Sequence, residues 1–177
     1  MGVQLEAFIK NTLTKKEILS LAKRLNKERP LAREKQNWKW QEEDIDEIFL
    51  EDYWKRDQDW YMGQLNAKKY DQIYKGAIIW GSDVHIHFYH PNLSIIGFMW
   101  KWSVFQRFPE VREKVEIDLK RLADFLGFNE CILTSELSGG KCSQELEENA
   151  RGDLSTLIEC FDKENRKYEL LRFQETT

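Results

Sequence analysis

A run of alternating apolar and polar residues near the middle of the chain constrains the fold more than any other feature. Between residues 84 and 89, a valine, an isoleucine and a phenylalanine alternate with two histidines and a tyrosine. Successive side chains of a β-strand point to opposite faces, so this run predicts a strand with one apolar face. Residues 76–80 form a short apolar run before it, and residues 94–104 alternate again after a turn. Together the three segments predict an antiparallel meander.

The segment before the meander has helical patterns. Thr14 and Glu17 have the spacing of a capping box, and apolar residues follow at helical intervals as far as Leu25. This pattern predicts a helix that Pro30 ends. Residues 41–62 have a second apolar stripe at helical spacing, with acidic residues on the other side. We interpret this second segment as helical too.

The segment after the meander alternates between helix and strand. Apolar residues at helical spacing from residue 109 to 126 predict a helix, and a glycine follows it as a stop signal. Residues 130–135 and 166–173 predict two further strands. A helix is expected between them, with Ser143 or Asp153 as its cap.

These elements predict one α+β domain over residues 1–177, of which residues 1–62 form a mostly helical N-terminal part. The sheet is expected to be antiparallel or mixed, with the three-strand meander and two later strands. Helices are expected mainly on one of its faces. The aromatic content of 13% is that of a chain with a packed core, not of a disordered chain.

Composition excludes several classes of function. No run approaches the roughly 20 apolar residues that span a bilayer, so a soluble protein without a membrane partner is expected. The net charge of −4 argues against nucleic acid as a partner. The three cysteines lack the close spacing of a disulfide framework or a zinc knuckle, which favours a reducing, cytoplasmic location.

The histidines are the first candidate site, because all three lie within six residues. Residues two apart on a strand share a face, so His85 and His87 could bind one metal ion such as zinc. Asp83 or His90 could supply a third ligand, although the sequence identifies none. A metal-dependent enzyme is therefore one alternative, and a solvated polar sheet face is a second. A third is a histidine that acts as an acid or base in a cleft, or as a pH-sensitive contact at an interface. No other cofactor is indicated.

Tryptophans beside acidic residues form the second candidate site. Lysine and arginine outnumber acids in residues 1–40, whereas nine acids outnumber two bases in residues 41–59. Large rings that anchor and charges that steer are typical of protein-binding surfaces. The alternative is that these rings pack the N-terminal helices onto the sheet. The candidate partner-binding residues are Trp38, Trp40, Trp54, Trp60, Glu42, Glu43, Asp44, Glu51 and Asp52.

One stretch suggests a family. Residues 119–136 read as a helix, a glycine stop and a short strand, and the tryptophan-rich meander precedes them. This layout resembles small bacterial immunity proteins that neutralise polymorphic or contact-delivered toxins, although no diagnostic motif is present. The resemblance covers about half of the chain. It implies a protein that binds and blocks a toxin without doing chemistry, with an acidic surface that faces a basic nuclease.

The leading hypothesis is therefore a non-enzymatic protein-binding module, an inhibitor or immunity-type protein whose partner could be a basic toxin. Two alternatives stay open. One is the small metal-dependent enzyme built on His85 and His87. The other is a structural subunit of a larger assembly. The sequence does not decide the oligomeric state.

Overall fold

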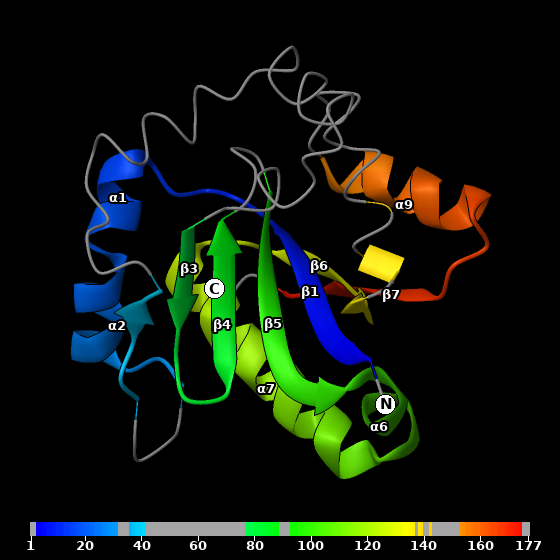
Figure 1. Ribbon diagram of the computed structural model, residues 1–177, viewed down its shortest axis with the longest axis horizontal. Coiled ribbons are helices and arrows are strands. Elements are labelled where there is room, and N and C mark those ends of the chain that lie inside the picture. Colours follow the sequence, from blue (N-terminus) through cyan, green and yellow to red (C-terminus); the bar gives the residue numbers. More distant parts are fainter. Residues whose placement is uncertain are drawn as a thin grey trace.

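The computed structural model describes residues 3–31, 36–41, 77–88, 93–136, 138, 139, 142 and 153–174. Within these ranges the chain is an α+β fold built on one antiparallel sheet (Figure 1). The strands are β1 (Gln4–Lys10), β2 (Lys39–Trp40), β3 (Ala77–Trp80), β4 (Val84–Phe88), β5 (Leu93–Lys101), β6 (Glu130–Ser135) and β7 (Tyr168–Arg172). The helices are α1 (Lys15–Leu19), α2 (Leu21–Glu28), α6 (Trp102–Arg107), α7 (Pro109–Leu126) and α9 (Leu154–Lys163).

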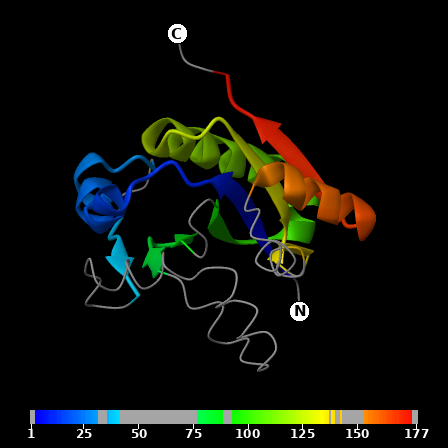
Figure 2. The ribbon, with the colours of Figure 1, turned by 90° about the horizontal axis from the view of Figure 1, so that it is seen from above.

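The strand order in the sheet is β2-β3-β4-β5-β1-β6-β7. The meander β3-β4-β5 confirms the alternation in the sequence, because β4 buries every second residue. The first strand in the sequence, β1, lies between β5 and β6, so it joins the meander to the two C-terminal strands. Figures 1 and 2 show α1 and α2 beside the β2–β3 end of the sheet, and α9 at the β6–β7 end.

The sheet has an apolar cluster on each face. The larger cluster takes buried residues from α1, α2, α6 and α7, and it confirms that the described helices pack mainly on one face. The smaller cluster lies on the other face, where α9 packs against Phe8 and Ile132. Along β1, the buried Leu5, Ala7 and Ile9 belong to the larger cluster, whereas Phe8 belongs to the smaller one. Both faces of β1 are therefore used.

Local signals in the sequence account for the helix ends. Thr14 and Glu17 form the predicted capping box of α1, in which each side chain bonds the backbone of the other. Gly127 ends α7 with a φ of 84°, a left-handed conformation that glycine adopts without strain. Asp153 caps α9, because its Oδ1 accepts a hydrogen bond from the Thr156 N–H at 2.7 Å.

The structure corrects three expectations about secondary structure. Residues 4–10 form the central strand β1, although the N-terminal part was expected to be mostly helical. The predicted strand at residues 94–104 ends at Lys101, and Trp102 begins α6, which buries Phe105. The helix predicted after Thr14 is divided at Ser20 into α1 and α2. The predicted helix at residues 41–62 lies, beyond Gln41, outside the described residues.

The structure also corrects the expectation about the cysteines. Cys142 and Cys160 form a disulfide that ties residue 142 to α9 within the smaller apolar cluster. Cys131 is a buried free thiol on β6. Spacing along the chain did not indicate this pair, because the two residues are 18 positions apart and meet only through tertiary packing.

Among the helices of the described ranges, none combines the length and the apolar character needed to cross a lipid bilayer.

Candidate functional site

A row of paired residues crosses the whole sheet on the face that α9 partly covers. Directly paired residues of antiparallel strands project to the same face, so one residue from each strand contributes to this row. We call it the polar row. In strand order it consists of Lys39, Trp80, His85, Gly97, Glu6, Thr134 and Tyr168.

Glu6 occupies the centre of the polar row. It lies on β1 opposite Gly97 of β5 and opposite Thr134 of β6. Burial raises the pKa of the Glu6 carboxyl to about 8, and repulsion from the nearby Glu136 adds to this rise. At neutral pH the carboxyl is therefore mostly protonated, and it can both donate and accept a hydrogen bond.

Gly97 allows the imidazole of His85 to lie on the sheet surface. A Cβ at position 97 would be 2.0 Å from Cε1 and 2.3 Å from Nε2 of His85, closer than any real contact. On its other side the imidazole packs against the indole of Trp80, with the ring centroids 4.5 Å apart. Burial lowers the pKa of His85, while Glu136 opposes this effect. His85 is therefore neutral at physiological pH.

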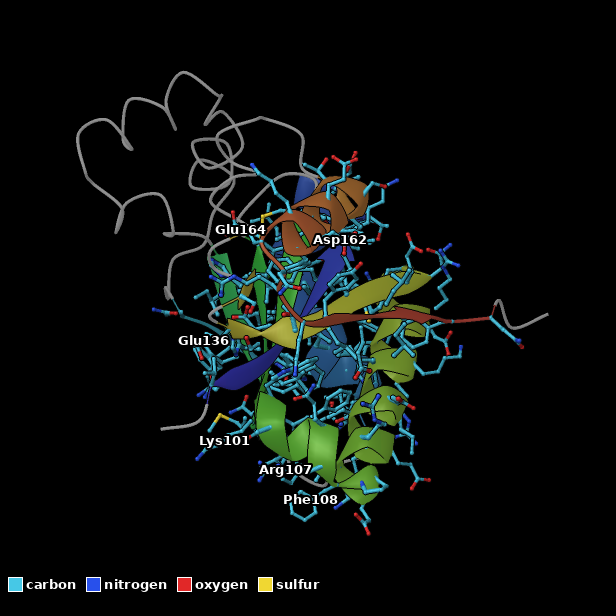
Figure 3. The ribbon with its side chains drawn as sticks, turned by 90° about the vertical axis from the view of Figure 1, so that its right-hand side faces the viewer. Lys101, Arg107, Phe108, Glu136, Asp162 and Glu164 are labelled. Atoms are coloured by element: carbon cyan, nitrogen blue, oxygen red, sulfur yellow. A yellow bond between two sulfur atoms is a disulfide. The ribbon has the colours of Figure 1, made fainter. Side chains whose placement is uncertain are left out.

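The negative charge of Glu136 raises the pKa of both titratable groups, Glu6 and His85. The Glu136 Oε2 accepts a hydrogen bond from the Gln4 backbone N–H at 3.2 Å, which holds the carboxylate beside β1. Figure 3 labels Glu136 and Lys101, and both project from the same side of the molecule. Glu136 is exposed, so this part of the face is open to solvent in the described structure.

Two large apolar side chains are exposed on the face of the polar row, and one of them, Trp80, belongs to the row itself. Trp80 is 41% exposed, and its indole N–H donates to Gln41 at 3.3 Å. Met99 is 60% exposed and lies two residues after Gly97 on β5, so it shares the face of the polar row. The face therefore combines exposed apolar surface with two carboxyl groups, of which one is uncharged at neutral pH.

The structure places the predicted histidine pair on one face, as expected from their spacing. His85 and His87 are both half-buried and lie opposite Gly97 and Ile95 of β5. In the described part of the chain, no group of three or more histidine, cysteine, aspartate or glutamate side chains has the arrangement of a metal site. His90, a suggested third ligand, lies outside the described residues.

The structure separates the predicted tryptophan anchors. Trp38 is only 2% exposed and belongs to the larger apolar cluster, which is at odds with a role as a surface anchor. Trp40 is half-buried and packs against Phe88, with ring centroids 6.1 Å apart. The other predicted partner-binding residues lie outside the described ranges: Trp54, Trp60, Glu42, Glu43, Asp44, Glu51 and Asp52.

Sequence reasoning missed the residues at the centre of the polar row. The signal for Glu6 is a carboxylate between Leu5 and Ala7, in a segment whose apolar residues alternate like those of a strand. The signal for Gly97 is a lone glycine inside a strand pattern, which often marks a close approach of another group. Neither signal shows that the two positions are neighbours.

Comparison of the chain with protein-family models, with curated proteins and with solved structures finds no match.

Proposed function

We propose that this protein is a non-enzymatic binding module whose partner is another protein, and that it acts as an inhibitor or immunity-type protein that neutralises that partner. The face of the polar row is the proposed contact surface. The observation that most supports this proposal is the exposure of Trp80 and Met99 on the same sheet face as the Glu6–Glu136 carboxyl pair.

The chemistry of this face suits protein recognition. Tryptophan and methionine are enriched at protein interfaces because they bury a large apolar area. Carboxyl groups beside them give the contact its specificity, since a partner must match their charge. The acidic residues between positions 42 and 59, which are predicted to steer a basic partner, carry the same negative charge as Glu136. They lie outside the described residues.

The metal-dependent alternative gains no specific support from the described residues. His85 is packed between Trp80 and Gly97, and its lowered pKa results from burial. We therefore propose a single function.

The proposal is tested by capturing partners from a lysate of the native source with wild-type protein and with Met99→Asp. Met99→Asp introduces a charge at an exposed apolar position of the proposed surface. Ile117→Asp is the matched control, because Ile117 is 45% exposed on α7, which packs on the other face. We expect wild type and Ile117→Asp to recover the same stoichiometric partner, and Met99→Asp to lose it.

Equal recovery by Met99→Asp, with a circular dichroism spectrum like that of wild type, would refute the proposed surface. The inhibitor part of the proposal needs a second measurement. The recovered partner should lose its toxic or enzymatic activity at a one-to-one ratio with this protein. A partner that stays fully active in the complex would reduce the proposal to a binding module without an inhibitory role.

A further inference from the structure

We propose that the edge strand β7 pairs with β7 of a second copy of this chain, so that two sheets join edge to edge around a two-fold axis at Leu170. This inference goes beyond the proposed function and does not depend on it. Trp80 and Met99, on which the proposed function rests, lie on β3 and β5, and the strands β1 and β6 lie between β5 and β7. The contact between copies is therefore at a different part of the sheet.

The first argument is that β7 is the longer of the two edge strands of the described sheet. It has five residues and pairs with β6, whereas the opposite edge strand, β2, has two residues. Natural edge strands are often kept short, or are interrupted by proline or a β-bulge, which prevents pairing with another chain. β7 pairs with β6 in one continuous register over all five residues, and its sequence contains no proline. Its open edge is therefore suited to the addition of a strand.

The second argument is that the pairing of β7 with β6 determines which backbone groups face outward. The Phe173 N–H, just after β7, donates to the carbonyl of Asn129 at 2.8 Å. Such bonds occur at every second residue of an antiparallel pair, so Leu171 and Glu169 also direct their N–H and C=O groups toward β6. The remaining N–H and C=O groups of β7 point away from the sheet and belong to Tyr168, Leu170 and Arg172.

This edge is complementary to its own copy in an antiparallel arrangement. With a two-fold axis perpendicular to the sheet at Leu170, the two Leu170 residues exchange both of their backbone hydrogen bonds. Tyr168 of each copy then pairs with Arg172 of the other, so all the outward-facing groups of β7 are bonded. A two-fold contact uses the same surface on both copies, and it therefore closes as a dimer.

The side chains along this edge match in the same register. Leu170 is 38% exposed, and it meets its own copy at the axis. The Tyr168 hydroxyl donates to Oδ1 of Asp162 at 2.9 Å, which places a carboxylate of α9 beside Tyr168. The side chain of Arg172 is 75% exposed, and its Nε lies 3.4 Å from Glu130. The two-fold axis brings Arg172 of one copy toward the Tyr168–Asp162 pair of the other, so opposite charges meet at both ends of the contact.

The charges favour a second copy over a strand of another protein. Strand addition through the backbone alone accepts many sequences, so the side chains must select the partner. Figure 3 shows β7 between α9 and α7, with Asp162 labelled on α9. The edge has this carboxylate at its Tyr168 end and the cation of Arg172 at its other end. An antiparallel copy presents the two ends in the reverse order, and it therefore supplies the matching charges.

The first test is the mass of the purified full chain, measured by light scattering over a dilution series that begins at millimolar protein. We expect the mass of two chains at high concentration. Leu170→Pro removes the N–H that bonds across the axis, but this N–H does not bond β6. The dissociation constant should rise at least about tenfold, because two hydrogen bonds at the axis are lost. The matched control Leu170→Thr keeps the N–H and should weaken the dimer less.

A charge reversal keeps the inference testable if the proline variant does not fold. Arg172→Glu should weaken the dimer, because like charges then meet at both ends of the contact, and Asp162→Lys should do the same. The double variant with both substitutions should restore the mass of two chains, because opposite charges meet again. Loss of the ion pair between Arg172 and Glu130 within one chain predicts no such rescue.

Hydrogen exchange provides a control within the strand. The Leu170 amide should exchange with solvent more slowly in wild type than in Arg172→Glu, whereas the Leu171 amide, which faces β6, should change much less. A wild-type mass of one chain at every concentration overturns the inference, even if a strand of another protein binds β7. A dimer that neither Leu170→Pro nor Arg172→Glu weakens forms through another surface, and it overturns the inference as well.

Discussion

Individual residues of the polar row are held in states that differ from those in water. Glu6 is the clearest case, because a carboxyl group at the centre of a sheet is neutral at a pH at which an exposed one is charged. The pKa of Glu17 shows the opposite effect. Glu17 is fully exposed in α1, and the backbone and side chain of Thr14 lower its pKa by hydrogen bonding. The pKa values of two glutamates eleven residues apart in the sequence are therefore shifted in opposite directions.

The raised pKa of Glu6 predicts a pH dependence of stability. The pKa rises from its ordinary value of 4.5 to about 8 on folding, so the folded state binds more protons within this window. The free energy of unfolding should therefore fall as pH rises from about 4.5 to about 8, by at most about 1.4 kcal/mol per pH unit for this group. Glu6→Gln should lose less stability than wild type between pH 6 and pH 8, measured by urea unfolding.

Glu17→Gln is the control for this prediction. The lowered pKa of Glu17 stabilises the fold above its ordinary value of 4.5, and that contribution is lost only as pH falls below it. Its slope between pH 6 and pH 8 should match that of wild type. Identical slopes for Glu6→Gln and wild type would contradict the assignment of a raised pKa to Glu6.

The contact between Gly97 and His85 predicts a coupled effect of two substitutions. Gly97→Ala places a methyl group where the imidazole lies, so it should cost about 1–3 kcal/mol of stability through overpacking. In a His85→Ala background the obstruction is gone, and the same substitution should cost much less. A double-mutant cycle on the free energy of unfolding measures this coupling. Equal costs in the two backgrounds would mean that the imidazole does not occupy this position.

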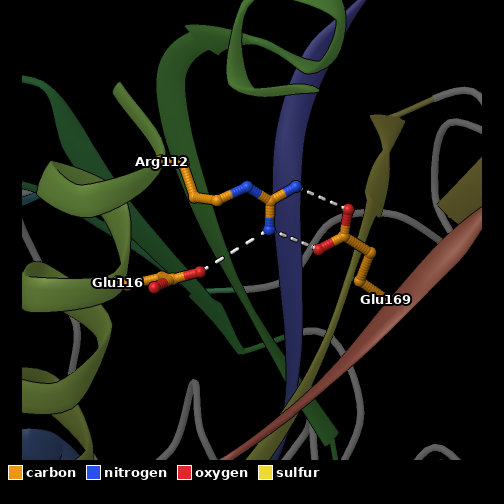
Figure 4. Close-up of polar contacts among 3 residues, drawn as sticks. All are labelled: Arg112, Glu116 and Glu169. Carbon is orange, nitrogen blue, oxygen red and sulfur yellow. Dashed lines mark hydrogen bonds and ion pairs between the residues drawn. The ribbon is translucent and has the colours of Figure 1, made fainter. Parts of the chain in front are cut away.

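At the scale of elements, one polar contact joins helix α7 to the edge strand β7 (Figure 4). Arg112 donates from both terminal nitrogens to the two carboxylate oxygens of Glu169, at 2.7 and 2.8 Å. The guanidinium also lies 4.3 Å from the ring centre of Phe105, and Glu116 is 3.5 Å away. The hydrogen bonds that Arg112 donates to Glu169 raise the pKa of Arg112 above its ordinary value. This contact docks an edge strand that has one neighbouring strand in the described sheet.

Arg112→Lys should therefore destabilise the protein although it keeps the charge. Lysine lacks the planar fork and the stacking on Phe105. Both partners are 35% exposed, so the expected loss is modest, about 0.5–1 kcal/mol, and smaller at high salt. Lys120→Ala is the control, because Lys120 pairs with Asp124 within α7 and joins no second element. Thermal unfolding should rank Arg112→Lys below Lys120→Ala, and the reverse order would count against docking by Arg112.

At the scale of the whole molecule, the two apolar clusters differ in how they are held. The larger one draws on four helices and most strands, whereas the smaller one depends on α9, a few sheet residues and the disulfide. Cys142 and Cys160 lie within this smaller cluster. The disulfide therefore strengthens the side of the sheet that has less apolar contact.

Removal of this disulfide should be costly under oxidising conditions. A crosslink across 18 residues restricts the unfolded chain by about 3 kcal/mol. Cys160→Ser should lower the free energy of unfolding by about that amount, and reductant should bring wild type to the same value. Cys131→Ala is the control, because the Cys131 thiol is buried and its pKa is raised to about 12. Reductant should destabilise Cys131→Ala as much as it destabilises wild type. A melting temperature of wild type that does not respond to reductant would contradict the disulfide.

The sequence predicted the features that depend on near neighbours. The capping box of α1, the Gly127 stop of α7 and the alternation of β4 each involve residues within a few positions, so composition and spacing were sufficient. The shared face of His85 and His87 follows from the same rule. The strand predicted from the alternation of residues 94–104 is too long. The chain changes to helix α6 at Trp102, and this helix buries Phe105 in the core.

The tertiary structure alone decided which distant segments meet. Insertion of β1 between β5 and β6 places Glu6 beside Gly97, and the Gln4–Glu136 hydrogen bond spans 132 residues. The same packing buries Trp38 and joins Cys142 to Cys160. Strand pairing and core packing depend on contacts between segments far apart in the chain, and one sequence contains no local signal for them. The sequence by itself therefore determined the individual elements, whereas the candidate site exists only because the sheet brings its residues together.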